Sequence, residues 1–292
     1  MSTATPTVSH RRRSAQRLRF LRFPSARIGL VAGGVVLLLA LLGPLFAPHS
    51  PSEIIGPPFR RPGAEGLLGT DFLGRDVLSR VLWGGRSVIA LSVAATVLAY
   101  IAGITIGLVA GYARSLVDSV LMRAMDVLLA FPPLLLLLVL ATGAGRSQLV
   151  LVVGVAITHI PGIARIVRAA TLEASVRSYV EAAVARGEPT RSILAREILP
   201  NILGTILADV GVRLTGSILL IASVNFLGLG LQPPAADWAL MISENRGGVR
   251  FQPWVIVVPA LLIALLTVAA NLVADGVARS LGTSIEREPV AR

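Results

Sequence analysis

Residues 87–113 read SVIALSVAATVLAYIAGITIGLVAGYA, a stretch of 27 residues without a charged side chain. A transmembrane helix needs about 20 mostly apolar residues to cross a hydrocarbon core about 30 Å thick. The chain holds five further charge-free stretches of 18 to 25 residues: Ile28–Ser52, Val127–Gly145, Ser147–Ala164, Leu214–Ala236 and Phe251–Ala274. We therefore predict an all-α polytopic membrane protein with six transmembrane helices.

The composition restricts the classes of protein to which the chain can belong. Of its 292 residues 54% are hydrophobic and 15% are charged, whereas a soluble domain carries about 25% charged residues. The absence of cysteine excludes disulfides, thiol catalysis and cysteine-ligated metals. All 27 basic residues are arginine, and the absence of lysine excludes a Walker A loop and Schiff-base chemistry. If the protein transports a solute against a gradient, another polypeptide must handle the ATP.

The arginines predict how the chain is oriented. Residues 1–27 contain seven arginines and no acid, and short cytoplasmic segments carry the excess of basic residues. With six spans both termini are cytoplasmic, which puts 18 arginines on the inner side and eight on the outer side. The net charge of +11 could indicate nucleic-acid binding, but no aromatic residues alternate with the arginines and no nucleic-acid-binding module is present. We therefore expect the tail to contact membrane lipids and no nucleic acid.

This topology divides the chain into five parts. We predict, in chain order, a basic cytoplasmic tail (1–27), a first transmembrane helix (28–52), an extracytoplasmic segment (53–86), a core with five transmembrane helices (87–280) and a cytoplasmic tail (281–292). Within the core, the cytoplasmic loop 165–200 is far longer than a minimal turn between helices.

One short helix is predicted inside that loop. Ser178 and Glu181 fit a capping box, in which the serine accepts from the backbone and the glutamate reaches back. Gly187 fits the left-handed residue that follows a helix. Pro189 can start a second helical stretch, and Pro200 marks the entry into the fifth span.

Two small residues, Ala182 and Ala183, stand side by side in this short helix. Small side chains let a helix sit deep in a groove of another protein. The alternative is a surface helix that lies on its own bundle, and the residues alone do not decide between the two.

Three glycines predict a close contact between helices. Gly103, Gly107 and Gly111 are four residues apart, so they lie on one face of the second span. A face of this kind lets the backbone of another helix approach closely, which favours association in lipid.

One pair of charges is predicted inside the fifth span, if that span begins near Asn201. Asp209 and Arg213 are four residues apart and face the same way on a helix. Because each charge would cost about 2.5–3.5 kcal/mol at the bilayer centre, we expect the two to pair. The pair faces the bundle interior, a partner subunit or the translocation path, or else it lies near the cytoplasmic headgroups.

We predict no catalytic, cofactor or metal site. His159 is the one histidine within the core spans, and we expect a hydrogen-bonded residue at a helix end there and not a ligand. The absence of H-E-x-x-H and G-x-S-x-G counts against an intramembrane enzyme. A secondary transporter would need an inverted repeat and ionisable residues near the midplane, and no repeat is visible. Both classes remain as alternatives.

Several motifs resemble those of one transporter family. Glu181-Ala182-Ala183, Gly187 and Ile198-Leu199-Pro200-Asn201 resemble the EAA signature of ABC importer permeases. Further stretches resemble, in the same order, motifs of the C-type permease subunit of oligopeptide and dipeptide importers: 66–86 (GLLGTDFLGRDVLSRVLWGGR), 110–133 (AGYARSLVDSVLMRAMDVLLAFPP), 225–234 (NFLGLGLQPP) and 266–276. Members of this family also transport nickel and glutathione, which remain alternative solutes.

The resemblance implies a fold, a location and a set of partners. The fold is that of a type I ABC importer permease in the bacterial inner membrane, and the chain is a non-catalytic subunit without a cofactor of its own. Its partners are a homologous second permease, two ABC ATPase subunits (or one fused ATPase) that bind ATP and Mg, and an extracytoplasmic solute-binding protein. From its position after the first span and its polar, Pro- and Gly-rich start, we expect segment 53–86 to help receive the binding protein. The alternative is a structural role in capping the second span.

The resemblance also assigns a role to the helix in the loop. It becomes the coupling helix that inserts into the ATPase, and its contact residues are Ser178, Glu181, Ala182, Ala183, Gly187 and Pro200. We expect both alanines to face the groove of the ATPase.

Overall fold

The computed structural model describes residues 23–63, 66–113 and 116–285. Within these ranges the chain is helical and has no strand. The α-helices are α2 (Pro24–Leu42), α3 (Val77–Ala113), α4 (Leu116–Leu129), α5 (Pro133–Gly143), α6 (Gln148–Ala174), α7 (Ser178–Ala185), α8 (Thr190–Ser192), α9 (Leu199–Phe226), α10 (Trp238–Asn245) and α11 (Trp254–Ile285). The predicted basic tail lies outside the described residues, apart from residues 23–27.

Among the described residues, five helical stretches are long and apolar enough to cross a membrane: α2 with the turn after it (Pro24–Leu45), α3, α6, the stretch that ends in α9 (Thr190–Phe226) and α11. The pair α4 and α5, bent by 85° relative to each other, makes a sixth if the two helices together form one span. The prediction of an all-α polytopic membrane protein is therefore confirmed.

The break between α4 and α5 was not predicted, because the charge-free stretch Val127–Gly145 runs across it. Pro132 and Pro133 lie at this break. Proline lacks a backbone N–H and its ring clashes with the preceding turn, so the helix ends before them and a new one starts at Pro133. Helix α4 begins before this stretch, at Leu116, and contains Asp118 and Asp126, which pair with Arg168 and Arg165 of α6.

Most other helix bounds also differ from the charge-free stretches. The first helix covers 24–42 and not 28–52, since a short turn with Pro44 follows it. The second begins at Val77, so residues 77–86 of the predicted extracytoplasmic segment are helical. Arg86 lies inside this helix because it donates to the carbonyl oxygens of Ala40 (3.2 Å) and Leu41 (2.6 Å) at the end of α2.

The predicted loop 165–200 is mostly helical. Helix α6 continues to Ala174, through Pro161. At the other end of the loop, α8 and the π-helical segment η3 (Ile193–Ile198) run directly into α9, which contains Asp209 and Arg213. Irregular backbone is thus confined to residues 175–177 and 186–189, on either side of α7. Helix α11 likewise runs past residue 280, into the predicted C-terminal tail.

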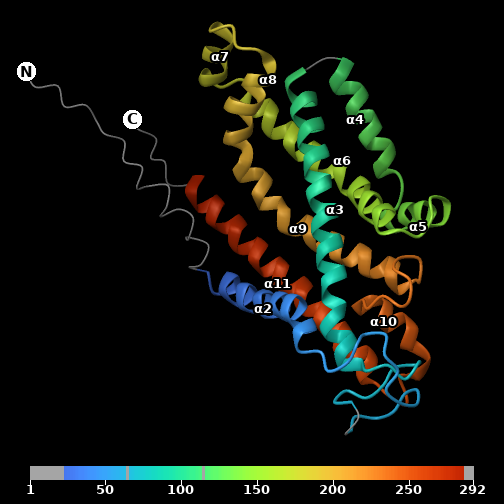
Figure 1. The fold of residues 1–292 in the computed structure, drawn as a ribbon. Helices are drawn as coiled ribbons and strands as arrows, with labels where there is room; N and C mark the ends of the chain where they lie inside the picture. The colour runs from blue at the N-terminus through green and yellow to red at the C-terminus, as the bar shows by residue number, and fades with distance from the viewer. Residues whose placement is uncertain (1–22, 64–65, 114–115, 286–292) are drawn as a thin grey trace, which may run out of the picture.

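The helices form a bundle with two distinct ends (Figure 1). Helices α3, α6 and α9 lie in the middle, α2 and α11 pack together on one side, and α4 and α5 lie on the other. Helix α7 lies at one end, which we call the α7 end. The loop between α2 and α3 lies with α10 at the opposite end, which we call the α10 end (Figure 1).

The three glycines of α3 lie where α3 crosses α6. A Cβ at Gly103 would lie 2.6 Å from Ile163, and one at Gly111 would lie 2.7 Å from Thr171. At Gly107 it would lie 2.6 Å from Val167 Cβ and 2.7 Å from a backbone carbonyl oxygen of α6. Contact this close requires glycine on the α3 side.

We predict that Gly107→Ala destabilises the protein, because the new methyl group would push α6 away. Overfilling a packed contact costs about 1–3 kcal/mol. Gly34→Ala in α2 is the matched control, since a Cβ there meets nothing within 4 Å. Alanine is favoured over glycine in a helix by about 0.5–1 kcal/mol, so the control should be neutral or stabilised. Thermal unfolding of the purified permease in detergent measures the difference, and equal midpoints for the two variants would contradict the close α3–α6 contact.

Candidate functional site

At the α7 end, the short helix ends as predicted but begins differently. Gly187 has φ +74°. Its N–H donates to the carbonyl oxygen of Val184 (2.9 Å), and that of Glu188 donates to Ala183 (3.2 Å), the paired bonds of a Schellman motif. The predicted capping box is wrong, because Arg177 takes the N-cap position without a side-chain cap and Ser178 is already helical.

The two neighbouring alanines of α7 face opposite environments. Ala182 is exposed, whereas Ala183 is fully buried and packs with Val180, Ile193 and Ile198 of the same chain. Adjacent residues point about 100° apart around a helix, so one alanine can face outward while the other faces the bundle. The expectation that both alanines face a groove of another protein is therefore wrong for Ala183. Glu181 and Ala182 are exposed, as are Ser178, Val184 and Gly187.

The turn after α7 is fixed by an ion pair. Arg186 donates to Glu188 Oε1 (2.6 Å) and Ser192 Oγ donates to Oε2 (3.1 Å). These hydrogen bonds hold the pKa of the Glu188 carboxyl below its ordinary value. Pro200 lies in the first turn of α9, as predicted for the entry into the fifth span, although helical backbone already precedes it in η3.

In the middle of the bundle, Asp209 and Arg213 form an ion pair of 2.9 Å that joins three helices. Tyr100 of α3 donates its hydroxyl to Asp209 Oδ2 at 2.9 Å. The guanidinium group of Arg213 lies against Gly162 of α6, where a Cβ would be 2.7 Å from both terminal nitrogens. The pair thus lies between α3, α6 and α9, with the side chains of Arg213 and Asp209 22% and 14% exposed.

The expectation for His159 is wrong in two respects. The residue lies in the middle of α6 and not at its end. Its Nε2 is buried and has no hydrogen-bond partner among the described residues. The imidazole packs against Gly216 of α9, where a Cβ would lie 2.9 Å from Cε1. The described residues contain no group of three or more His, Cys, Asp or Glu side chains that could hold a metal ion.

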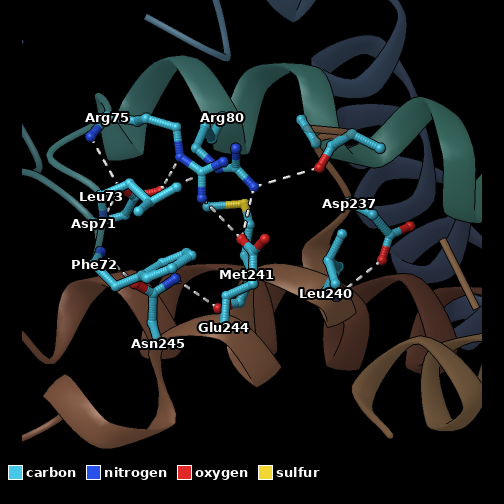
Figure 2. A network of polar contacts seen from close by, with 12 residues as sticks. Asp71, Phe72, Leu73, Arg75, Arg80, Asp237, Leu240, Met241, Glu244 and Asn245 are labelled. Carbon is cyan, nitrogen blue, oxygen red and sulfur yellow. Dashed lines mark hydrogen bonds and ion pairs between the residues drawn. The ribbon is translucent and has the colours of Figure 1, made fainter. Parts of the chain in front are cut away.

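At the α10 end, four charged side chains form a buried network that the sequence analysis missed (Figure 2). Arg75 donates to Asp71 Oδ2 (2.6 Å) and to Glu244 Oε2 (3.0 Å). Arg80 donates to the same Glu244 oxygen (2.9 Å) and lies 3.5 Å from Asp71. All four side chains are at most 7% exposed, and the two arginines balance the two carboxylates. Burial nevertheless raises the pKa of the Glu244 carboxyl above its ordinary value, although the two arginines act to lower it.

Further contacts attach α10 to α3 and to the preceding loop. Asp237 caps α10 by accepting from two backbone N–H groups, and it also accepts from Ser87 of α3 at 2.7 Å. Burial raises the pKa of Asp237. Trp238 donates its indole N–H to the Val81 carbonyl oxygen at 2.8 Å, and Asn245 accepts from the Phe72 N–H at 2.9 Å. The loop, the start of α3 and α10 are thereby held as one unit.

We predict that Arg80→Met strongly destabilises the α10 end, because it leaves Glu244 and Asp71 with one cation between them. Removing one partner of a buried ion pair costs about 3–5 kcal/mol. Arg165→Met is the control, because its pair with Asp126 is 51% and 59% exposed and such pairs contribute about 1 kcal/mol or less. Chemical unfolding in detergent compares the two variants. Similar losses would mean that the buried network has no special role in stability.

Two family models match the chain and together cover most of it. Residues 103–287 match the family model described as binding-protein-dependent transport system inner membrane component. Residues 13–61 match the N-terminal transmembrane domain of oligopeptide transport permease C.

Two curated relatives extend the match over most of the chain. A di/tripeptide transport system permease of Pseudomonas aeruginosa is 34% identical, and the match covers 88% of each protein. A glutathione transport system permease of Pectobacterium atrosepticum is 38% identical, over 77% of this chain and 75% of the relative.

A solved structure shares the fold. The inward-facing MetNI methionine ABC transporter contains a chain that matches with a TM-score of 0.56 at 17% identity, over 69% of this chain and 96% of that one. This likeness confirms the predicted permease fold. The chain therefore belongs to the family of binding-protein-dependent transport system inner membrane components.

Proposed function

We propose that this chain forms the translocation pathway of a bacterial ATP-driven importer of oligopeptides or dipeptides, together with a homologous second permease in the inner membrane. The observation that carries the proposal is the di/tripeptide permease relative, which matches along 88% of the chain and not in one motif alone. The glutathione permease relative supports glutathione, itself a small peptide, as a second candidate solute.

The complex supplies the parts that this chain lacks. Two ABC ATPase subunits, or one fused ATPase, bind ATP and Mg, because this chain has no lysine for a Walker A loop. An extracytoplasmic binding protein delivers the solute. This chain contributes no covalent chemistry, and its task is to change shape when the ATPases do.

The α7 end faces the cytoplasm in this proposal, and the α10 end faces outward. Helix α7 is the coupling helix, and its exposed residues Glu181 and Ala182 contact the ATPase. Through Ala183, α7 packs on the helical segment that leads into α9, so a displacement of α7 displaces α9 with it. The Asp209–Arg213 pair and Tyr100 then connect α9 to α3. Two helices without irregular breaks, α6 and α8–η3–α9, thus lead from α7 into the membrane.

The solute is tested by uptake into proteoliposomes that contain the two permeases and the ATPases. With Mg-ATP and peptide-loaded binding protein, we expect uptake of a radiolabelled dipeptide. Excess unlabelled peptide should inhibit this uptake by competition. Omitting ATP or the binding protein serves as the control. Uptake of glutathione alone would select the second candidate solute. Peptide uptake driven by an ion gradient without ATP would contradict the proposed function.

The coupling role predicts different effects at the two alanines of α7. Ala182→Trp fills the outward surface, so it should abolish ATP-driven uptake while the thermal stability of the isolated permease stays unchanged. Ala183→Trp overfills the chain's own packing, which costs about 1–3 kcal/mol, and it should lower that stability. Normal uptake and normal stimulation of ATP hydrolysis in Ala182→Trp would refute the coupling assignment, and loss of permease stability in that variant would also contradict it.

A further inference from the structure

The ion pair in the middle of the bundle leaves one edge of its guanidinium group unused. Arg213 Nε donates to Asp209 Oδ2 at 2.9 Å, and the same oxygen accepts from the Tyr100 hydroxyl. No residue that the structure describes accepts a hydrogen bond from the two terminal nitrogens of Arg213. These nitrogens form the edge of the guanidinium group that lies away from Nε, so two parallel donors remain available there.

A glycine of α6 fixes the place of this guanidinium group. A Cβ at Gly162 would lie 2.7 Å from both terminal nitrogens, so only glycine lets the group lie directly on the α6 backbone. Arg213 is thus held from two sides, by Asp209 of its own helix and by the backbone of α6. A side chain that is already ordered loses less conformational entropy when it binds a ligand.

The pair belongs to a charged face that the chain itself does not cover. The Arg213 and Asp209 side chains are 22% and 14% exposed. Arg165 follows Gly162 on the same face of α6, one turn nearer the α7 end, and Arg165 and its partner Asp126 are 51% and 59% exposed. Helices α6 and α9 pack side by side in the middle of the bundle (Figure 1). We call Gly162 and Arg165 of α6 with Asp209 and Arg213 of α9 the α6–α9 face.

Water suits the α6–α9 face better than lipid does. A charged side chain at the bilayer centre costs about 2.5–3.5 kcal/mol. Ionisable residues in membrane segments almost always face the bundle interior or a water-filled cavity, where they mark the path of a substrate. The other side of α9 differs, because the cavity that it forms with α2 and α11 is lined mostly by apolar residues such as Leu207 and Leu214. The α6–α9 face is therefore the side of α9 that is suited to an aqueous path.

We infer that the terminal nitrogens of Arg213 bind the carboxylate of a peptide in transit. Guanidinium groups bind carboxylates through two parallel hydrogen bonds, and the free edge of Arg213 offers two parallel donors. A linear peptide with a free C-terminus carries such a carboxylate whatever its side chains are. The inference rests on the proposed function, which supplies the peptide and an aqueous path beside the bundle.

The test uses the absence of cysteine from the chain. Thr158→Cys places one thiol a turn away from Gly162 on the same face of α6, at a half-buried position. Its labelling by the uncharged reagent N-ethylmaleimide, followed by mass spectrometry of this chain, reports whether a ligand covers the α6–α9 face. Ser52→Cys, at an exposed position of the loop between α2 and α3, is the control thiol.

The complex of both permeases with the ATPases is labelled in phosphatidylcholine nanodiscs, without nucleotide and without binding protein. One probe is N-acetyl-dialanine, which has a free carboxylate and no amino group. The other is its C-terminal amide, which has the same size and lacks the carboxylate. Each probe is titrated while the labelling rate is measured.

We expect N-acetyl-dialanine to slow the labelling of Thr158→Cys, whereas the amide should not, and neither should affect Ser52→Cys. Arg213→Met should raise the concentration for half-maximal protection by about tenfold or more, because a hydrogen bond to a charged group contributes about 1.5–3 kcal/mol. Arg213→Lys keeps a cation beside Asp209 but lacks the two parallel donors, so its protection should be intermediate. Tyr100→Phe loosens Asp209 and leaves the free edge intact, so it should resemble wild type.

Three results would overturn the inference alone: a thiol at position 158 that does not react, equal protection by the acid and the amide, or unchanged protection in Arg213→Met. Slower labelling on addition of phosphatidylglycerol, seen only while Arg213 is present, would assign the guanidinium group to lipid phosphate and would also overturn it. Failure of the wild-type importer to take up any peptide would overturn the proposed function, and the inference with it.

Discussion

The structure depends on one constraint, which is that a charge removed from water needs an opposite charge beside it. The chain satisfies it most fully at the α10 end, where two arginines meet two carboxylates that are at most 7% exposed. Arg213 with Asp209 in the middle of the bundle and Arg168 with Asp118 near the α7 end are partly exposed pairs of the same kind. Each of these pairs joins different helices or, for Asp209, brings in Tyr100 of another helix. In the low dielectric of the protein and membrane interior, a charged side chain must be paired with an opposite charge. The same ion pairs therefore also orient the helices toward one another.

Helix continuity determines how a displacement at one end reaches the other. Helix α7 is too short to be independent, and Ala183 anchors it to the segment that becomes α9. The glycines of α3 let α6 approach until the two helices interlock, so neither slides without the other. If α7 is the coupling helix, as we propose, a displacement of α7 is passed to α9 and, through these contacts, to α3 and α6.

The sequence predicted the number of membrane-crossing stretches well, because charge-free length is the physical requirement for a span. It predicted their bounds poorly, because Arg80, Arg86 and Asp118 lie inside helices where partners compensate their charge. The turn at Gly187 follows from local backbone geometry and was predicted correctly. The capping box was not, because the helix begins one residue earlier, with Arg177 at the N-cap position and no side-chain cap. The network of Arg75, Arg80 and Glu244 could not be found, because its partners lie more than 160 residues apart.

The buried charges at the α10 end require an explanation other than stability. Replacing a buried ion pair by apolar side chains of similar volume is often neutral or stabilising. Apolar packing would tolerate a loop that slides along a helix. At the α10 end, however, a shift of the loop by one residue along α10 would leave Arg75 or Glu244 buried without its partner. Such a shift would cost several kcal/mol. The network therefore fixes the loop before α3 in one position on α10.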